Sequence, residues 1–96
     1  NARADRLLRH LRRWQALNDK PISQSDWEDN GKNKWCILYS YGAEKLYVDY
    51  FHYIRLHNVI YFTTRETAEK AIEVFRDELL WYFTEYVQRL DEAQNG

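Results

Sequence analysis

Two runs of alternating residues, joined by a short turn, place the strongest constraint on the fold of this 96-residue chain. In residues 34–41 the side chains of Trp, Ile and Tyr alternate with Cys, Leu and Ser, and residues 46–53 alternate in a similar way. This period of two, with many aromatic and β-branched residues, is typical of β-strands. Gly42 lies between the runs and can adopt a positive φ, so the sequence predicts a β-hairpin. A short connection then favours a third antiparallel strand over residues 59–62.

A helix with two contrasting faces is predicted before the hairpin, over residues 2–17. At 100° per residue, one stripe is apolar and is formed by Ala4, Leu7, Leu8, Leu11 and Trp14. The opposite arc carries His10 and five arginines, Arg3, Arg6, Arg9, Arg12 and Arg13. Pro21 cannot continue a helix, so this one should end near Asn18 and Asp19.

A second helical region is predicted after the sheet, over residues 63–93. Thr63 and Glu66 have the spacing of a capping box, in which the threonine side chain accepts from the backbone and the glutamate reaches back. Apolar residues then recur at helical spacing, and no Pro or Gly interrupts residues 63–92. One long helix and two helices with a kink both fit this pattern. We favour a break near Asp77 and Glu78, because an unbroken helix of about 28 residues would extend about 42 Å, beyond a small core.

Together these elements predict one α+β domain spanning residues 1–96. It consists of a basic helix (1–18), an acidic loop with Trp27 as anchor (19–33), a three-stranded antiparallel sheet (34–62) and the C-terminal helical region (63–93). The chain is 45% apolar, which is too much for a disordered chain, and no apolar run approaches the length of a membrane span. The predicted core comprises Trp35, Ile37, Leu46, Val48, Ile60, Phe62, Ala68, Ile72 and Phe75.

Charge is distributed unevenly along the chain. Residues 1–20 carry six basic and two acidic side chains, a net charge of +4, whereas residues 21–96 carry eight basic and thirteen acidic ones, a net charge of −5. The formal total of −1 therefore hides a basic arm on an acidic body.

The residues that could support catalysis or bind metal do not form a recognisable pattern. His52 and His57, with Glu44 and Asp49 nearby, lack the paired Cys and His spacing of a zinc site. The single cysteine, Cys36, lies inside an apolar strand and is expected to be a core residue rather than a nucleophile. With three glycines in the chain, no phosphate-binding loop can be formed. We therefore expect a non-enzymatic protein without metal or cofactor.

Binding to another protein is the preferred function class, because aromatic residues make up 17% of the chain and Tyr and Trp are enriched at interfaces. The candidate partner-binding residues are Arg6, Arg9, Arg13, Trp27, Tyr47, Tyr53, Glu69 and Glu73. The alternative is a nucleic-acid-binding accessory protein that uses its arginine-rich helix, against which the acidic body counts. A homodimer could form if the stripe with Leu7, Leu11 and Trp14 packed against a second copy.

Three segments carry a resemblance to a known group of proteins: KWCILY (34–39), LYVDY (46–50) and IYFTTRETAEKAIE (60–73). With Trp27 in its acidic loop, the chain resembles small proteins encoded by phages and prophages of Gram-positive bacteria. The resemblance covers about residues 27–76, and the chain departs from the group in having no glycine near residues 77–78.

The resemblance implies a location in the bacterial cytoplasm, where the lone Cys36 would stay reduced. It also implies a role of the kind that accessory phage proteins often have, which is to bind and block a host protein. A host defence nuclease such as a CRISPR effector is one candidate, because an acidic body could occupy its basic DNA channel. No catalytic residue follows from the resemblance.

Overall fold

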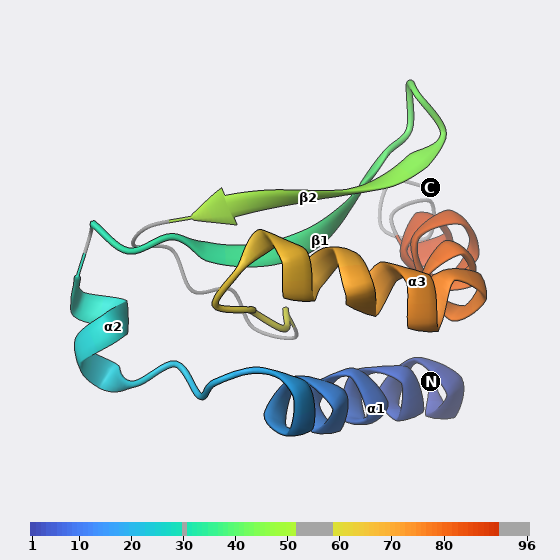
Figure 1. The fold of residues 1–96 in the computed structure, drawn as a ribbon. Helices are drawn as coiled ribbons and strands as arrows, with labels where there is room; N and C mark the ends of the chain where they lie inside the picture. The colour runs from blue at the N-terminus through green and yellow to red at the C-terminus, as the bar shows by residue number, and fades with distance from the viewer. Residues whose placement is uncertain (30, 52–58, 91–96) are drawn as a thin grey trace.

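The computed structural model describes residues 1–29, 31–51 and 59–90 and has an α+β fold. Helix α3 (Arg65–Trp81) lies between a two-stranded sheet on one side and helix α1 (Ala2–Asn18) on the other (Figure 1). The sheet consists of β1 (Lys34–Ser40) and β2 (Lys45–Phe51). The predicted N-terminal helix, antiparallel hairpin and C-terminal helix are therefore confirmed.

Helix α1 is held on α3 by the apolar stripe that the sequence predicts. Ala4, Leu7 and Leu11 are buried, and Trp14 packs against the same core. The Asn1 side chain caps the helix by accepting from the backbone N–H groups of residues 3 and 4. Because Leu7 and Leu11 are buried within the chain, the predicted use of this stripe as a surface for self-association is wrong.

The segment predicted to be a loop over residues 19–33 contains a short helix, α2 (Gln24–Glu28). Ser23 and Asp26 form a capping box, in which Ser23 Oγ accepts from the Asp26 N–H at 3.2 Å. The sequence holds this signal, but the segment has too few apolar residues for a helical period to be visible.

The hairpin has the predicted antiparallel pairing, with Trp35 opposite Tyr50 and Ile37 opposite Val48. The residue with positive φ in its turn is Glu44, at 54°, and not the predicted Gly42. The sheet itself is smaller than predicted. Among the described residues no third strand forms, because residues 59–62 pair with β1 only through the bridge between Phe62 and Trp35.

Asp19 binds the chain directly after this bridge. Its carboxylate accepts from the Thr63 N–H at 2.7 Å and from the Thr63 hydroxyl, so the chain turns away from the sheet towards the end of α1. Thr63 is consequently unavailable as a helix cap. Thr64 caps α3 instead, accepting from the Thr67 N–H at 3.1 Å, so the predicted capping box of Thr63 and Glu66 is wrong.

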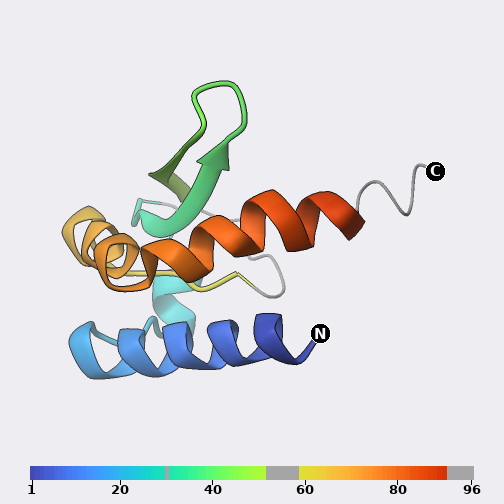
Figure 2. The same ribbon diagram turned by 90° about the vertical axis from the view of Figure 1, so that its right-hand side faces the viewer.

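The C-terminal helical region bends earlier than predicted. The non-helical residue is Phe75, with φ −113° and ψ 20°, rather than Asp77 or Glu78. Its ring meets Trp14 of α1 edge to face at a centroid distance of 6.5 Å. After Trp81 the chain continues as a π-helix, η1 (Tyr82–Val87), which extends away from α3 and past the hairpin (Figure 2).

The core lies where α1, α3 and the hairpin meet. Of the predicted core residues, Ile37, Phe62, Ala68 and Ile72 are buried, and the others, Trp35, Leu46, Val48, Ile60 and Phe75, pack against them while partly exposed. Leu7, Leu11, Ala71 and Leu79 from the helices complete the cluster.

Candidate protein-binding surfaces

The structure separates the predicted partner-binding residues into three groups. Arg6, Arg9 and Arg13 share the outer face of α1, whereas Tyr47, Glu69 and Glu73 line a groove between β2 and α3. Trp27 lies on α2, away from both surfaces, and Tyr53 lies outside the described residues. The sequence therefore predicts residues of both the outer face of α1 and the groove, but it does not show that these two surfaces are separate.

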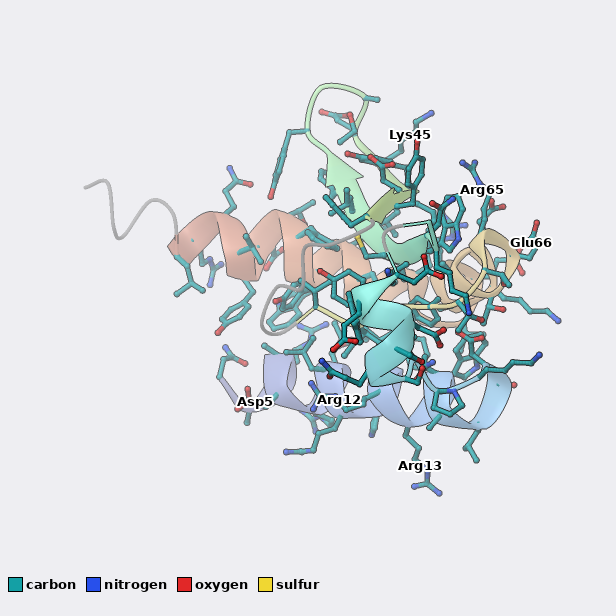
Figure 3. The ribbon with its side chains drawn as sticks, turned by 90° about the vertical axis from the view of Figure 1, so that its left-hand side faces the viewer. Asp5, Arg12, Arg13, Lys45, Arg65 and Glu66 are labelled. Carbon is teal, nitrogen blue, oxygen red and sulfur yellow. The ribbon has the colours of Figure 1, made fainter. Side chains whose placement is uncertain are left out.

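The outer face of α1 is a row of guanidinium groups. At 100° per residue, Arg6, Arg9 and Arg13 fall within about 60° of one another, opposite the buried leucines, and Arg12 lies beside them. All four are exposed, and Arg13 points away from the rest of the molecule (Figure 3). Within residues 1–29, 31–51 and 59–90, none of them forms an ion pair. We call these four residues the arginine face.

Arg3, on the same helix, is already bound within the chain. Its Nε and Nη2 atoms donate to the two carboxylate oxygens of Glu78 at 3.1 and 2.8 Å, and its guanidinium lies 4.1 Å from the centroid of the Trp81 ring. The hydrogen bonds raise the pKa of Arg3 and lower the pKa of Glu78. Arg3 thus shows how a guanidinium of this helix binds a carboxylate beside an aromatic ring.

The groove between β2 and α3 has an apolar floor and charged walls. Leu46, Val48 and Ile72 form the floor, Tyr47 lines it as well, and the groove has a volume of about 340 Å³. Its walls carry two acidic and two basic side chains, Glu69, Glu73, Arg65 and Arg76. The two arginines were not predicted, although their helical spacing to Glu69 and Glu73 places all four on one side of α3.

Trp27 makes structural contacts within the chain, and its role in binding stays a prediction. Its ring meets Tyr61 edge to face at a centroid distance of 4.9 Å, and Lys34 Nζ lies 5.6 Å from its centre. Lys34 is itself buried and donates to the Asp29 carbonyl at 2.9 Å. These contacts hold α2 against the start of β1.

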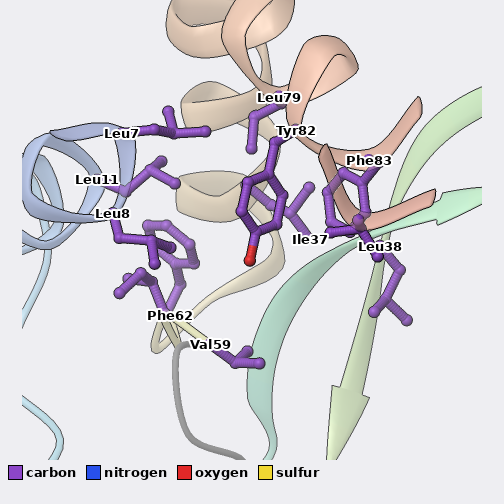
Figure 4. Close-up of a pocket in the computed structure, with 12 residues that line it drawn as sticks. Leu7, Leu8, Leu11, Ile37, Leu38, Val59, Phe62, Leu79, Tyr82 and Phe83 are labelled. Carbon is purple, nitrogen blue, oxygen red and sulfur yellow. The ribbon is translucent and has the colours of Figure 1, made fainter. Parts of the chain in front are cut away.

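An apolar cavity of about 170 Å³ opens between α1, β1 and η1 (Figure 4). Leu7 and Leu11 reach it from α1, and Tyr82 and Phe83 reach it from η1. The Tyr82 hydroxyl is the one polar side-chain group among its lining residues, and burial raises the pKa of that hydroxyl. Such a lining has no pair of groups for acid–base catalysis.

Cys36 is 1% exposed, as expected for a core residue. Burial, together with the nearby Asp49, raises the pKa of its thiol to about 11, so the reactive thiolate is scarce at neutral pH. The described residues contain no group of three His, Cys, Asp or Glu side chains that could hold a metal ion, and His52 and His57 lie outside them. No helix within the described ranges is long and apolar enough to cross a membrane.

Comparison of the chain with protein-family models, with curated proteins and with solved structures found no match. The resemblance to phage proteins therefore stays a prediction, and the assignment of function depends on the two surfaces.

Proposed function

We propose that this protein is a non-enzymatic binding module whose arginine face docks onto an acidic surface of another protein. The observation that supports this proposal is that Arg6, Arg9, Arg12 and Arg13 are exposed together and form no ion pair within the described part of the chain. Guanidinium groups bind carboxylates through paired hydrogen bonds, and Arg is enriched at protein interfaces.

The charge of the remaining chain favours a protein partner over a nucleic acid. Residues 21–96 carry a net charge of −5, so their long-range field opposes the approach of a polyanion. An acidic patch on a protein is local, and it can meet the arginine face without facing the acidic body. The pairing of Arg3 with Glu78 is an example of that chemistry within this chain.

Nucleic-acid binding is the second candidate function, and one observation favours it. Arg6, Arg9 and Arg13 lie within eight residues of one helix, about 10 Å along its axis, and can contact successive phosphates of a strand. A contact of this kind would weaken steeply as the salt concentration rises.

Charge reversal on the arginine face tests the proposal and separates the two candidates. The test compares the wild type with Arg6→Glu/Arg9→Glu/Arg13→Glu in two assays. One is capture of proteins from nuclease-treated bacterial lysate, and the other is binding to labelled duplex DNA and single-stranded RNA. Lys20→Glu/Lys70→Glu/Arg89→Glu is the matched control, because it changes the net charge equally at exposed positions outside α1 and outside the groove between β2 and α3.

The proposal predicts a stoichiometric protein that the wild type and the control capture and the α1 variant does not. Salt-sensitive binding of DNA or RNA that only the α1 variant loses would replace the proposal with the second candidate. Equal capture by all three proteins would contradict the proposal, and equal binding of DNA and RNA by all three would contradict the second candidate. The identification of the partner as a host defence nuclease rests on the resemblance alone and stays a prediction.

A further inference from the structure

At the outer edge of β2, the outward backbone groups of Leu46 and Val48 have no partner within the described residues. Trp35 exchanges both backbone hydrogen bonds with Phe62, at 2.9 and 2.7 Å, so its N–H and C=O point away from β2. In an antiparallel pair these directions alternate, and Tyr50, opposite Trp35, must therefore point its own groups outward. By the same alternation, Leu46 and Val48 direct N–H and C=O to the open edge, where no described element lies beside β2 (Figure 1).

Side chains along β2 are self-complementary about Tyr47. Lys45 lies two residues before it and Asp49 two residues after it. If a second β2 ran antiparallel with Tyr47 opposite Tyr47, each Lys45 would face the Asp49 of the other strand. In that register Leu46 lies opposite Val48, and each such pair exchanges two backbone hydrogen bonds, which gives four in all.

The neighbouring registers lack this match. Centring the pair on Val48 would place Tyr47 opposite Asp49, and it would require the Tyr50 N–H, which already donates to Asp49 Oδ1 at 2.8 Å. Centring it on Asp49 would oppose two carboxylates. Centring it on Leu46 would leave the charges of Lys45 and Asp49 unmatched. Only the Tyr47 register uses the available backbone groups and both charges.

We propose that β2 pairs with β2 of a second copy of this chain, in the register centred on Tyr47, to form a four-stranded antiparallel sheet across a two-fold axis. The groove beside β2 suits this contact, because its two arginines and two glutamates give it no net charge. Tyr47 is 38% exposed and would be covered by its counterpart. The edge of β2 is separate from the arginine face. A result that overturns the dimer therefore leaves the proposed function unaffected, and the reverse also holds.

A cysteine on the two-fold axis tests the register directly. Residues opposite each other in a non-hydrogen-bonded pair have Cα atoms about 4.5 Å apart, which suits a disulfide. Under mild oxidation Tyr47→Cys should shift from the monomer mass to twice that mass on a non-reducing gel. The wild type, whose Cys36 is buried, and Tyr41→Cys, exposed on the same hairpin but off the axis, are the controls and should keep the monomer mass.

Reversing the charges one at a time tests the same pairing without a covalent bond. Lys45→Asp and Asp49→Lys each place like charges opposite one another, and each should raise the dissociation constant of the homodimer by about tenfold or more. A mixture of the two variants restores both opposite-charge pairs. The mixture should therefore associate into a heterodimer, which sedimentation can measure.

Each outcome decides the question. Cross-linking at Tyr47→Cys together with heterodimer formation supports the dimer. A wild-type protein that sediments as a monomer at every concentration tested would overturn it. So would equal cross-linking of Tyr41→Cys and Tyr47→Cys, or single-charge variants that self-associate as tightly as the wild type. A circular dichroism spectrum of each variant confirms that it is folded.

Discussion

The two faces of α1 differ in both burial and charge. The inner face buries Leu7 and Leu11, at 3% and 4% exposure, against α3 and Phe62. The outer face carries four arginines that contact no carboxylate within the described residues. The inner face therefore accounts for the position of the helix, whereas the four arginines of the outer face form no ion pair that would fix it within the described residues. The side chains that hold this helix in the fold are thus different from those through which we propose that it binds a partner.

The largest expected effect is on the inner face. Leu11→Ala should lower the free energy of unfolding by about 2–5 kcal/mol, because it removes buried methyl groups and leaves a cavity. Leu17→Ala, on the same helix at 74% exposure, is the control and should change it by less than about 0.5 kcal/mol. Urea denaturation measures both. Similar losses of unfolding free energy in the two variants would contradict the distinction between the inner and outer faces.

A smaller effect is expected where α1 is joined to the start of α3. Asp19→Ala should cost about 1.5–3 kcal/mol, because the half-buried Thr63 N–H and hydroxyl lose their charged acceptor. Asp19→Asn keeps one acceptor oxygen and should cost less. Thermal unfolding ranks the stabilities of the two variants. An Asn variant less stable than the Ala variant would contradict the role of Asp19 as the acceptor for Thr63.

The pair of Arg3 and Glu78 should contribute a small, pH-dependent stability. The pKa of Glu78 is lowered below its ordinary value of 4.5 by the hydrogen bond from Arg3, so its contribution is present above pH 4.5. The contribution disappears as the pH falls through the lowered pKa. Unfolding of the wild type and of Glu78→Gln across this range should give curves that converge in acid. Curves that stay parallel would show that the ion pair contributes nothing.

The smallest effect on stability is expected on the outer face. Arg6→Glu/Arg9→Glu/Arg13→Glu should change the free energy of unfolding by less than about 1 kcal/mol, because all three side chains are exposed. Chemical denaturation measures the change. A loss comparable to that of Leu11→Ala would mean that the arginines support the fold, and the comparison of the two faces would then fail.

The elements with a clear period could be predicted from the sequence. The stripe of Ala4, Leu7 and Leu11 predicts α1, and the alternation over residues 34–41 and 46–53 predicts the hairpin, whose strands are observed at residues 34–40 and 45–51. Both signals are local, since they depend on residues at most a few positions apart.

The errors arose where contacts distant in sequence decide the structure. Thr63 is an adequate cap in its local sequence, but Asp19, 44 residues earlier, binds it, and the cap moves to Thr64. The expected third strand over residues 59–62 is likewise reduced to the bridge between Phe62 and Trp35. The bend at Phe75, where the ring contacts Trp14 of α1, likewise has no signal in the neighbouring sequence.

The candidate surfaces were only partly predictable for the same reason. Helical periodicity places Arg6, Arg9 and Arg13 together, and the structure agrees. It could not show that Arg3 is bound to Glu78, 75 residues away, or that Tyr47 shares a groove with Glu69 and Glu73. Pairing across elements requires the tertiary fold.

The most direct test of the central claim is capture from nuclease-treated lysate by folded Arg6→Glu/Arg9→Glu/Arg13→Glu beside the wild type. If the outer face of α1 is a protein-binding surface, the variant keeps its unfolding midpoint and loses the protein that the wild type captures. A variant that is equally stable and captures the same protein as the wild type would contradict the claim.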